Sequence, residues 1–271
     1  MTGNAVEALV EANGTRLNVR LEGSSLAPCV VLIHSLGTDL TIWDEQARAL
    51  ARIYRVLRLD IRGHGRSDAP KGPYSMELLA ADACALLAHF GIRGAHIVGI
   101  SLGGLIGLAL AEAKAGEIAS LCVCDTNAEV SADFAKGIED RNLLVREKGM
   151  AAIAQAMVER WLTLETIAAK PMLADHIRDL VRTTPVEGFV GCAQAIRSSR
   201  LDRALGTIAL PTLFVAGDRD MANEPVRRMH AALPGSTFVE IGGASHLANL
   251  DQPEAFNRAI LEFLERIVKS G

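Results

Sequence analysis

Short apolar runs of strand length alternate with helical patterns along most of the chain. Residues 15–23 alternate apolar and polar side chains, as a half-exposed strand does. Other runs are almost continuously apolar, which is typical of parallel strands covered on both faces; they span residues 29–35, 54–60, 95–101, 120–125 and 212–218. Helical patterns lie between them, for example at residues 76–91 and 105–116. This order predicts an α/β fold with a mostly parallel, doubly wound sheet flanked by helices.

The alternation of strands and helices stops after Asn127 and resumes at Leu210. The residues between them are rich in helix formers and contain no convincing strand. This pattern predicts a helical lid, residues 128–207, inserted between two strands of the sheet. No low-complexity linker separates it from the rest, so we expect one folded unit whose core comprises residues 1–127 and 208–271.

The composition predicts a compact globular protein and limits the kinds of partner that we expect it to bind. Of the 271 residues, 49% are apolar and 22% are charged, and the mean hydropathy is +0.22. The net charge of −4 leaves no basic surplus to neutralise phosphates, which argues against a nucleic-acid partner. The N-terminus lacks the pattern of a signal peptide, and no run of about 18 apolar residues occurs. We therefore expect a cytoplasmic protein with no membrane association.

The five cysteines are odd in number and lie mostly in apolar runs. Cys122 and Cys124 are spaced as alternate residues of one strand, but no histidine or second cysteine pair completes a metal site. We expect reduced, buried thiols rather than disulfides or a bound metal.

Polar side chains that could carry chemistry follow several of the predicted strands. In an open parallel sheet, ligands bind beyond the carboxyl ends of the strands. The polar residues at these ends are Ser35, Asp60, Ser101, Asp125, Asp218 and Asp220. Ser101 is the centre of a G-x-S-x-G motif, residues 99–103, that lies between a predicted strand and a predicted helix. A sharp turn there would present the hydroxyl as a nucleophile, with the N–H of Leu102 as a donor to an oxyanion.

A serine nucleophile needs a base that is oriented by an acid, and both residue types follow along the chain. His246 lies just ahead of the last predicted helix, and Asp220 follows the strand before that. The order serine, acid, histidine is that of the α/β-hydrolases. Asp125, at the end of another strand, is the alternative acid, whereas we expect Asp218 to cap its own turn.

The loop after the first buried strand supplies the second expected oxyanion donor. In His34-Ser35-Leu36-Gly37, Ser35 takes the place of the first glycine of an H-G-x-G pattern, and the N–H of Leu36 is the expected donor. We expect His34 and His64 to order their own loops rather than to act in catalysis.

The chain resembles the α/β-hydrolase superfamily over essentially its whole length, and within it the 3-oxoadipate enol-lactonases. Stretches that carry the resemblance are "GISLGGLIGLALA", "EKGMAAIAQAMVERWLT", "PVEGFVGCAQAIR" and "GGASHLANLDQPEAF". The resemblance implies an enzyme that opens a small carboxylated enol-lactone in aromatic catabolism without a metal or organic cofactor. It also implies that Ser101 attacks the carbonyl, that His246 moves the proton, and that Arg160 and Trp161 face the substrate from the lid.

Two departures from the enol-lactonase pattern, at His34 and near Asp125, bring the chain closer to generic esterases. A second hypothesis is therefore an esterase, amide hydrolase or C–C bond hydrolase that acts on another small acidic substrate. A third is a receptor that kept the fold and binds a ligand without catalysis. All three predict a small-molecule partner, and the sequence leaves open whether the chain forms a homo-oligomer.

Overall fold

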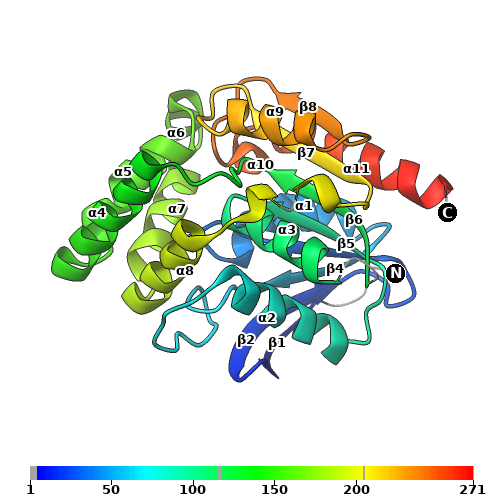
Figure 1. Cartoon of the computed structure of the whole chain (residues 1–271), viewed down its shortest axis with the longest axis horizontal. Coiled ribbons are helices and arrows are strands. Elements are labelled where there is room, and N and C mark those ends of the chain that lie inside the picture. Colours follow the sequence, from blue (N-terminus) through cyan, green and yellow to red (C-terminus); the bar gives the residue numbers. More distant parts are fainter. Residues whose placement is uncertain (1–4, 115–116, 204, 271) are drawn as a thin grey trace.

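One eight-stranded sheet runs through the molecule in the order β1-β2-β4-β3-β5-β6-β7-β8 (Figure 1). Its strands are β1 (Val6–Ala12), β2 (Thr15–Glu22), β3 (Cys29–Ile33), β4 (Arg55–Leu59), β5 (Ala95–Ile100), β6 (Ile118–Cys124), β7 (Thr212–Gly217) and β8 (Thr237–Ile241). β2 pairs antiparallel with β1 and β4, and the pairings from β4 to β8 are parallel. The central strands are buried along their length because helices cover both faces. The predicted doubly wound, mostly parallel sheet is therefore confirmed.

The computed structural model describes residues 5–114, 117–203 and 205–270. Residues 1–4 and 271, at the ends of the predicted core, lie outside this part. Residues 115–116, which end the predicted helix 105–116, and residue 204, in the predicted lid, lie outside it as well.

The first strand, β1, was not expected from the sequence. It forms a hairpin with β2 through Asn13 and Gly14, whose φ angles are +49° and +73°. Asn-Gly at the centre of a two-residue turn is a strong hairpin signal, because both residues adopt positive φ readily. That signal stands between two alternating segments and could have located β1.

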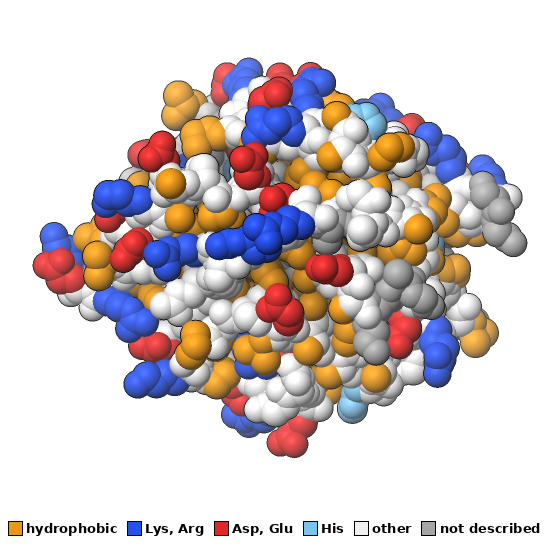
Figure 2. All heavy atoms as spheres, viewed as in Figure 1, with side chains coloured by type: hydrophobic (Ala, Val, Ile, Leu, Met, Phe, Trp, Pro, Cys, Tyr) orange, Lys and Arg blue, Asp and Glu red, His pale blue; other side chains and the backbone are white. Residues whose placement is uncertain are grey.

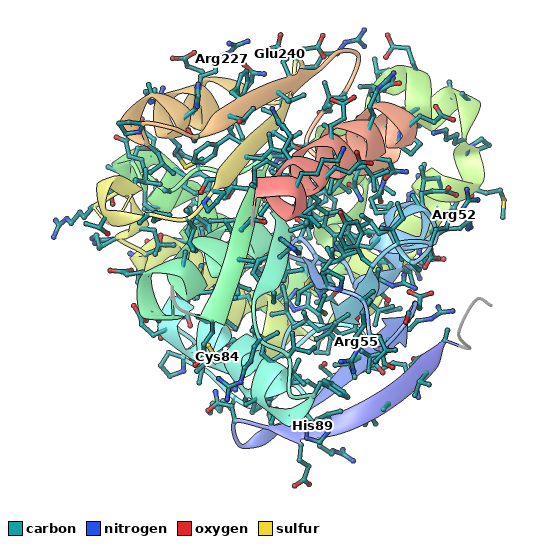
Figure 3. The ribbon with its side chains drawn as sticks, turned by 90° about the vertical axis from the view of Figure 1, so that its right-hand side faces the viewer. Arg52, Arg55, Cys84, His89, Arg227 and Glu240 are labelled. Atoms are coloured by element: carbon teal, nitrogen blue, oxygen red, sulfur yellow. The ribbon has the colours of Figure 1, made fainter. Side chains whose placement is uncertain are left out.

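Helices cover the sheet in two layers (Figures 1 and 3). One face carries α1 (Asp44–Leu50) and α11 (Pro253–Ser270), which pack on each other. The other carries α2 (Met76–His89), α3 (Leu102–Lys114) and α9 (Asn223–Ala232). The short helices η1 (Leu40–Trp43) and α10 (Ala248–Asp251) lie in the loops at the carboxyl ends of the strands. The core between the layers is apolar, and its largest fully buried side chains include Trp43, Phe214 and Phe256.

The segment between β6 and β7 is helical, as predicted. It contains α4 (Ala132–Lys148), α5 (Ala151–Trp161), α6 (Leu164–Ala169), α7 (Pro171–Thr183), α8 (Val186–Ser198), η3 (Leu201–Arg203) and η4 (Leu205–Thr207). α4 to α8 gather on one side of the sheet in Figure 1, where α5 packs on α7 and α4 packs on α8. The division into a core and a lid with boundaries at residues 128 and 207 stays a prediction.

The surface in Figure 2 mixes basic and acidic side chains rather than gathering one sign. Many are paired across elements: Arg227 of α9 lies beside Glu240 of β8 at 2.5 Å (Figure 3). Among the helices of the described residues, none is long and apolar enough to cross a membrane.

Candidate active site

Ser101 lies at a sharp turn between β5, which ends at Ile100, and α3, which begins at Leu102. Its φ is +55°, a conformation that non-glycine residues seldom adopt. A side chain at Gly103 would collide with the carbonyl of Ile33, and one at Gly99 would collide with the carbonyl of Gly103. The two glycines of the motif are thus required by close backbone packing, which holds the strained turn in place.

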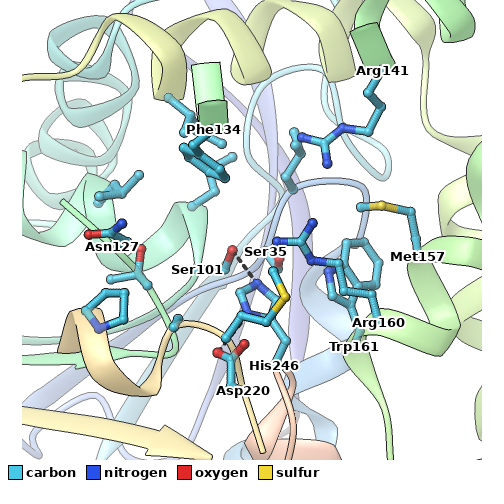
Figure 4. A pocket seen from close by; sticks show the side chains of 18 residues that line it. Ser35, Ser101, Asn127, Phe134, Arg141, Met157, Arg160, Trp161, Asp220 and His246 are labelled. Atoms are coloured by element: carbon cyan, nitrogen blue, oxygen red, sulfur yellow. Dashed lines mark hydrogen bonds and ion pairs between the residues drawn. The ribbon is translucent and has the colours of Figure 1, made fainter. Parts of the chain in front are cut away.

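His246 joins Ser101 to Asp220 by two hydrogen bonds (Figure 4). The distance from His246 Nε2 to Ser101 Oγ is 2.9 Å, and that from Nδ1 to Asp220 Oδ2 is 3.0 Å. Asp220 comes from the turn after β7, and His246 from the loop that follows β8. The structure brings the three predicted residues together from strand ends that are far apart in the sequence.

The surroundings of the Asp220 carboxyl favour its ionised form. Its side chain is 6% exposed. Burial by itself raises the pKa of Asp220, but the charge of His246 and the hydrogen bond from it outweigh burial and bring the pKa below its usual value. The group can therefore orient the imidazole and balance a positive charge on it.

Neither Asp125 nor Asp218 forms a hydrogen bond to His246 in the described structure. Asp125 is fully buried, and its Oδ1 accepts the N–H of Gly217 at 2.8 Å. Asp218 Oδ1 accepts the N–H of Ala244 at 3.1 Å, so it ties the end of β7 to the loop that carries His246. Asp218, which was expected to cap its own turn, thus connects two loops instead.

The loop of residues 34–37 lies against the Ser101 turn and is held by two buried histidines. The N–H of Ile61 donates to His34 Nε2 and the N–H of Gly37 donates to His64 Nε2, both at 2.9 Å. Burial, reinforced by the neighbouring His34, lowers the pKa of His64 to about 3. A neutral imidazole can accept these N–H groups, in agreement with the expected structural role.

Leu36, Leu102 and Ser35 line the same cavity as Ser101. Leu102 is the first residue of α3, and the first N–H groups of a helix have no acceptor within it. The hydroxyl of Ser35 is buried and has no hydrogen-bond partner in the described part of the chain. Three potential donors, the N–H groups of Leu36 and Leu102 and the Ser35 hydroxyl, thus belong to residues that line the cavity beside Ser101.

The cavity of about 160 Å³ is lined on the other side by residues of the helical segment. Arg160 and Trp161, at the end of α5, line it as expected. Apolar side chains complete the wall, among them Leu105, Phe134, Met157 and Ile196. Such a site suits a small ligand with an apolar body and a few polar groups.

Arg141 is a cavity residue that the sequence analysis missed. Its guanidinium points toward the cavity in Figure 4, and its Nε is buried without a partner among the described residues. Burial and the nearby charge of Arg160 lower the pKa of Arg141 to about 10, so it stays charged at neutral pH. Its position on the same helical stripe as Ile138 and Val145, which are buried, is the signal that could have found it.

The sequence matches the model of the α/β hydrolase family over residues 30–259. It is 33% identical to 3-oxoadipate enol-lactonase 2 of Acinetobacter baylyi, over 94% of this chain and 95% of that one. The crystal structure of the enol-lactonase from Burkholderia xenovorans LB400 superposes with a TM-score of 0.92 at 36% identity, over 95% of this chain and 100% of that one. A malate-bound thermophilic esterase from Thermogutta terrifontis gives a TM-score of 0.88 at 28% identity, over 98% and 99%. The fold, the strand-end geometry and these matches together show that the chain belongs to the α/β-hydrolase family.

Proposed function

We propose that this protein is a serine hydrolase that opens the ester bond of a small carboxylated enol-lactone. The observation that carries the proposal is the continuous relay Ser101–His246–Asp220 at the floor of a cavity that also holds two arginines. The similarity to two enol-lactonases supports the choice of substrate. The reaction needs no metal or organic cofactor.

In the first half of the reaction, Ser101 Oγ attacks the lactone carbonyl while its proton passes to His246 Nε2. The carbonyl oxygen becomes an oxyanion between the N–H groups of Leu36 and Leu102, with the Ser35 hydroxyl as a further donor. The ring C–O bond then breaks, the enol oxygen takes the proton from His246, and an acyl-enzyme remains.

In the second half, a water molecule gives a proton to His246 and attacks the acyl carbon. The bond to Ser101 Oγ breaks, and the proton returns to that oxygen. The released enol tautomerises to the keto acid. Asp220 keeps its charge throughout and stabilises the imidazolium that forms in each half.

The arginines set the substrate class. The Nε of Arg141 is buried without a partner among the described residues, and Arg160 lines the same cavity nearby. Two guanidinium groups close together repel each other, which costs free energy unless an anion lies between them. A carboxylate fits the planar geometry of a guanidinium group. The helices between residues 128 and 207 act as the lid that brings both groups to the substrate.

A second candidate is an esterase for another small acidic substrate. The similarity to the Thermogutta terrifontis esterase favours it, because that similarity also extends over nearly the whole chain. Both candidates use the same nucleophile, and they differ in the ring and the leaving group of the substrate.

The experiment is covalent trapping followed by turnover. A fluorophosphonate should add one group to the wild type by intact mass, and peptide mapping should place it on Ser101. Ser101→Ala should lose both the adduct and the turnover of p-nitrophenyl acetate, while Ser35→Ala, the matched control, should still be labelled. Turnover at the wild-type rate in Ser101→Ala would overturn the proposal. Carboxylated and neutral enol-lactones and esters then separate the two candidates by kcat/KM.

A further inference from the structure

A second carboxyl group, that of Asp125, lies directly beside the acid end of the relay. Asp125 follows β6 with a φ of +45°, and its side chain is fully buried. Its N–H donates to the carbonyl of Val215 at 2.9 Å, and its Oδ1 accepts the N–H of Gly217 at 2.8 Å. Both partners belong to β7, the strand that leads to Asp220, so the Asp125 side chain is fixed relative to that turn.

The other oxygen of Asp125, Oδ2, has no hydrogen-bond donor among the described residues although it is buried. The Asp220 carboxyl lies within hydrogen-bonding reach of the Asp125 carboxyl. Two ionised carboxylates offer only acceptors to each other, and two negative charges in a buried site repel strongly. The contact is favourable only when one of the two holds a proton and donates it to the other.

The surrounding groups decide which carboxyl holds the proton. Asp220 contacts His246 and feels the charge of Arg160, and both favour its ionised form. The titratable neighbours of Asp125 are Asp220 and the buried Cys124 thiol, which supply no positive charge. Burial, and then the charge of Asp220, raise the pKa of Asp125 well above its usual value, and the N–H groups of Gly217 and Ala248 offset only a part.

We propose that Asp125 is a carboxylic acid at neutral pH and that its Oδ2–H donates a hydrogen bond to the Asp220 carboxylate. The pair then carries a single negative charge, which faces His246. Asp125 is a positioning residue: it holds the Asp220 carboxylate in the orientation that His246 needs. Its effect on catalysis rests on the proposed function, whereas its protonation state can be measured without turnover.

The first test uses Asp125→Asn, which keeps an acceptor for Gly217 and a donor for Asp220. An unfolded aspartate ionises above pH ~4, so across the higher pH range the native wild type must hold a proton that the unfolded chain releases. Wild-type stability should therefore fall as pH rises, by up to about tenfold in the unfolding constant per pH unit. The Tm of Asp125→Asn should equal that of the wild type near pH 4 and exceed it by several degrees at pH 7.

Asp251→Asn is the matched control, because Asp251 is also buried but is surrounded by donors. Its oxygens accept the N–H of Ser245 at 2.8 Å and that of Thr163 at 3.1 Å. An amide would turn a donor toward one of these groups, so its Tm should fall at pH 7. A Tm of Asp125→Asn below that of the wild type at pH 7, as in the control, would overturn the proposal.

The second test observes the proton directly in protein labelled with γ-¹³C aspartate, in the Ser101→Ala background. The signal that Asp125→Asn removes should keep the chemical shift of a protonated carboxyl from pH 4 to 7. A shift typical of an ionised carboxylate at pH 7 would overturn the assignment. Neither result depends on turnover, so this outcome is separate from a failure of the serine mechanism.

The positioning role is tested by measuring kcat at constant pH for variants whose circular dichroism spectra show that they are folded. Asp125→Leu has a similar shape but no donor for Asp220, and its kcat should fall by about tenfold or more with KM little changed. Asp125→Asn should restore most of that loss. Equal kcat values for the two variants would contradict the positioning role.

Discussion

The N–H of Leu247 donates to the carbonyl of Trp161 at 2.9 Å. On the other side of His246, the hydroxyl of Ser245 donates to the carbonyl of Arg160 at 3.1 Å. The loop that carries His246 is thus attached, on both sides of this residue, to the end of α5. The helix end that lines the cavity thus also holds the His246 loop, and under the proposed function this contact links substrate binding to proton transfer.

This attachment predicts that a change at Trp161 affects catalysis as well as stability. Trp161 is 3% exposed, and Trp161→Ala should cost about 3–5 kcal/mol of unfolding free energy, as buried aromatic truncations do. It should also lower kcat, because the cavity that forms lets the end of α5 shift. Trp43→Ala is the control: it truncates a buried tryptophan that lies outside the cavity, so kcat per folded molecule should hold. Equal kcat losses in the two variants would contradict the link.

Asp220→Asn is expected to lower kcat by about 10²–10⁴, because an amide no longer holds the imidazole in the required tautomer. Asp218→Asn is the control, because it keeps an acceptor for the N–H of Ala244. Its kcat should change by less than about threefold, in line with surface changes that remove no partner. A larger loss in Asp125→Asn than in Asp220→Asn would instead transfer the acid role to Asp125.

The lowered pKa of Asp220 also predicts how this residue contributes to stability at acid pH. A carboxyl with a depressed native pKa stabilises the fold above its unfolded pKa of ~4 and loses that contribution as the pH falls through the native value. The Tm difference between the wild type and Asp220→Asn should therefore be largest near neutral pH and shrink below pH ~4. A difference that stays constant from pH 7 to pH 3 would contradict the ionised state of Asp220.

Arg141→Met is expected to raise KM for carboxylated substrates by about tenfold or more and to leave neutral ones little changed, because a charge-assisted hydrogen bond is lost. It should also raise Tm, since it replaces a charged group whose Nε is buried and has no partner among the described residues. Arg146→Met, on the exposed side of α4, is the control. Steady-state kinetics on substrate pairs with and without a carboxylate gives the comparison. Equal effects of Arg141→Met on both kinds of substrate would exclude the carboxylate role.

Ser35→Ala is expected to lower kcat by about tenfold while Tm holds or rises. The hydroxyl is buried without a partner among the described residues, so its removal costs the native state nothing, whereas the oxyanion loses a donor. Thr38→Val is the contrast, because the Thr38 hydroxyl donates to the Ser35 carbonyl at 2.8 Å and its loss should lower Tm. If Ser35→Ala lowered Tm and left kcat unchanged, the hydroxyl would be structural.

Local patterns were sufficient to locate most of the strands and the Ser101 turn. β3, β5 and β7 fall within the predicted apolar runs and β6 overlaps one from Ser120 on, because a strand covered on both faces needs apolar side chains along its length. The motif around Ser101 is equally local, since its glycines are required by backbone contacts within the turn and with the adjacent strand. β1 was not predicted because most of this edge strand is exposed, so its apolar side chains form no continuous run.

The sequence by itself thus determined the α/β architecture, the candidate nucleophile and the order of its partners along the chain. Only the tertiary structure decided that Asp220 and not Asp125 reaches His246, that Arg141 points into the cavity, and that the end of α5 holds the histidine loop. These contacts join residues far apart in the sequence. They depend on the register of β6 against β7 and on helix packing, which no local pattern encodes.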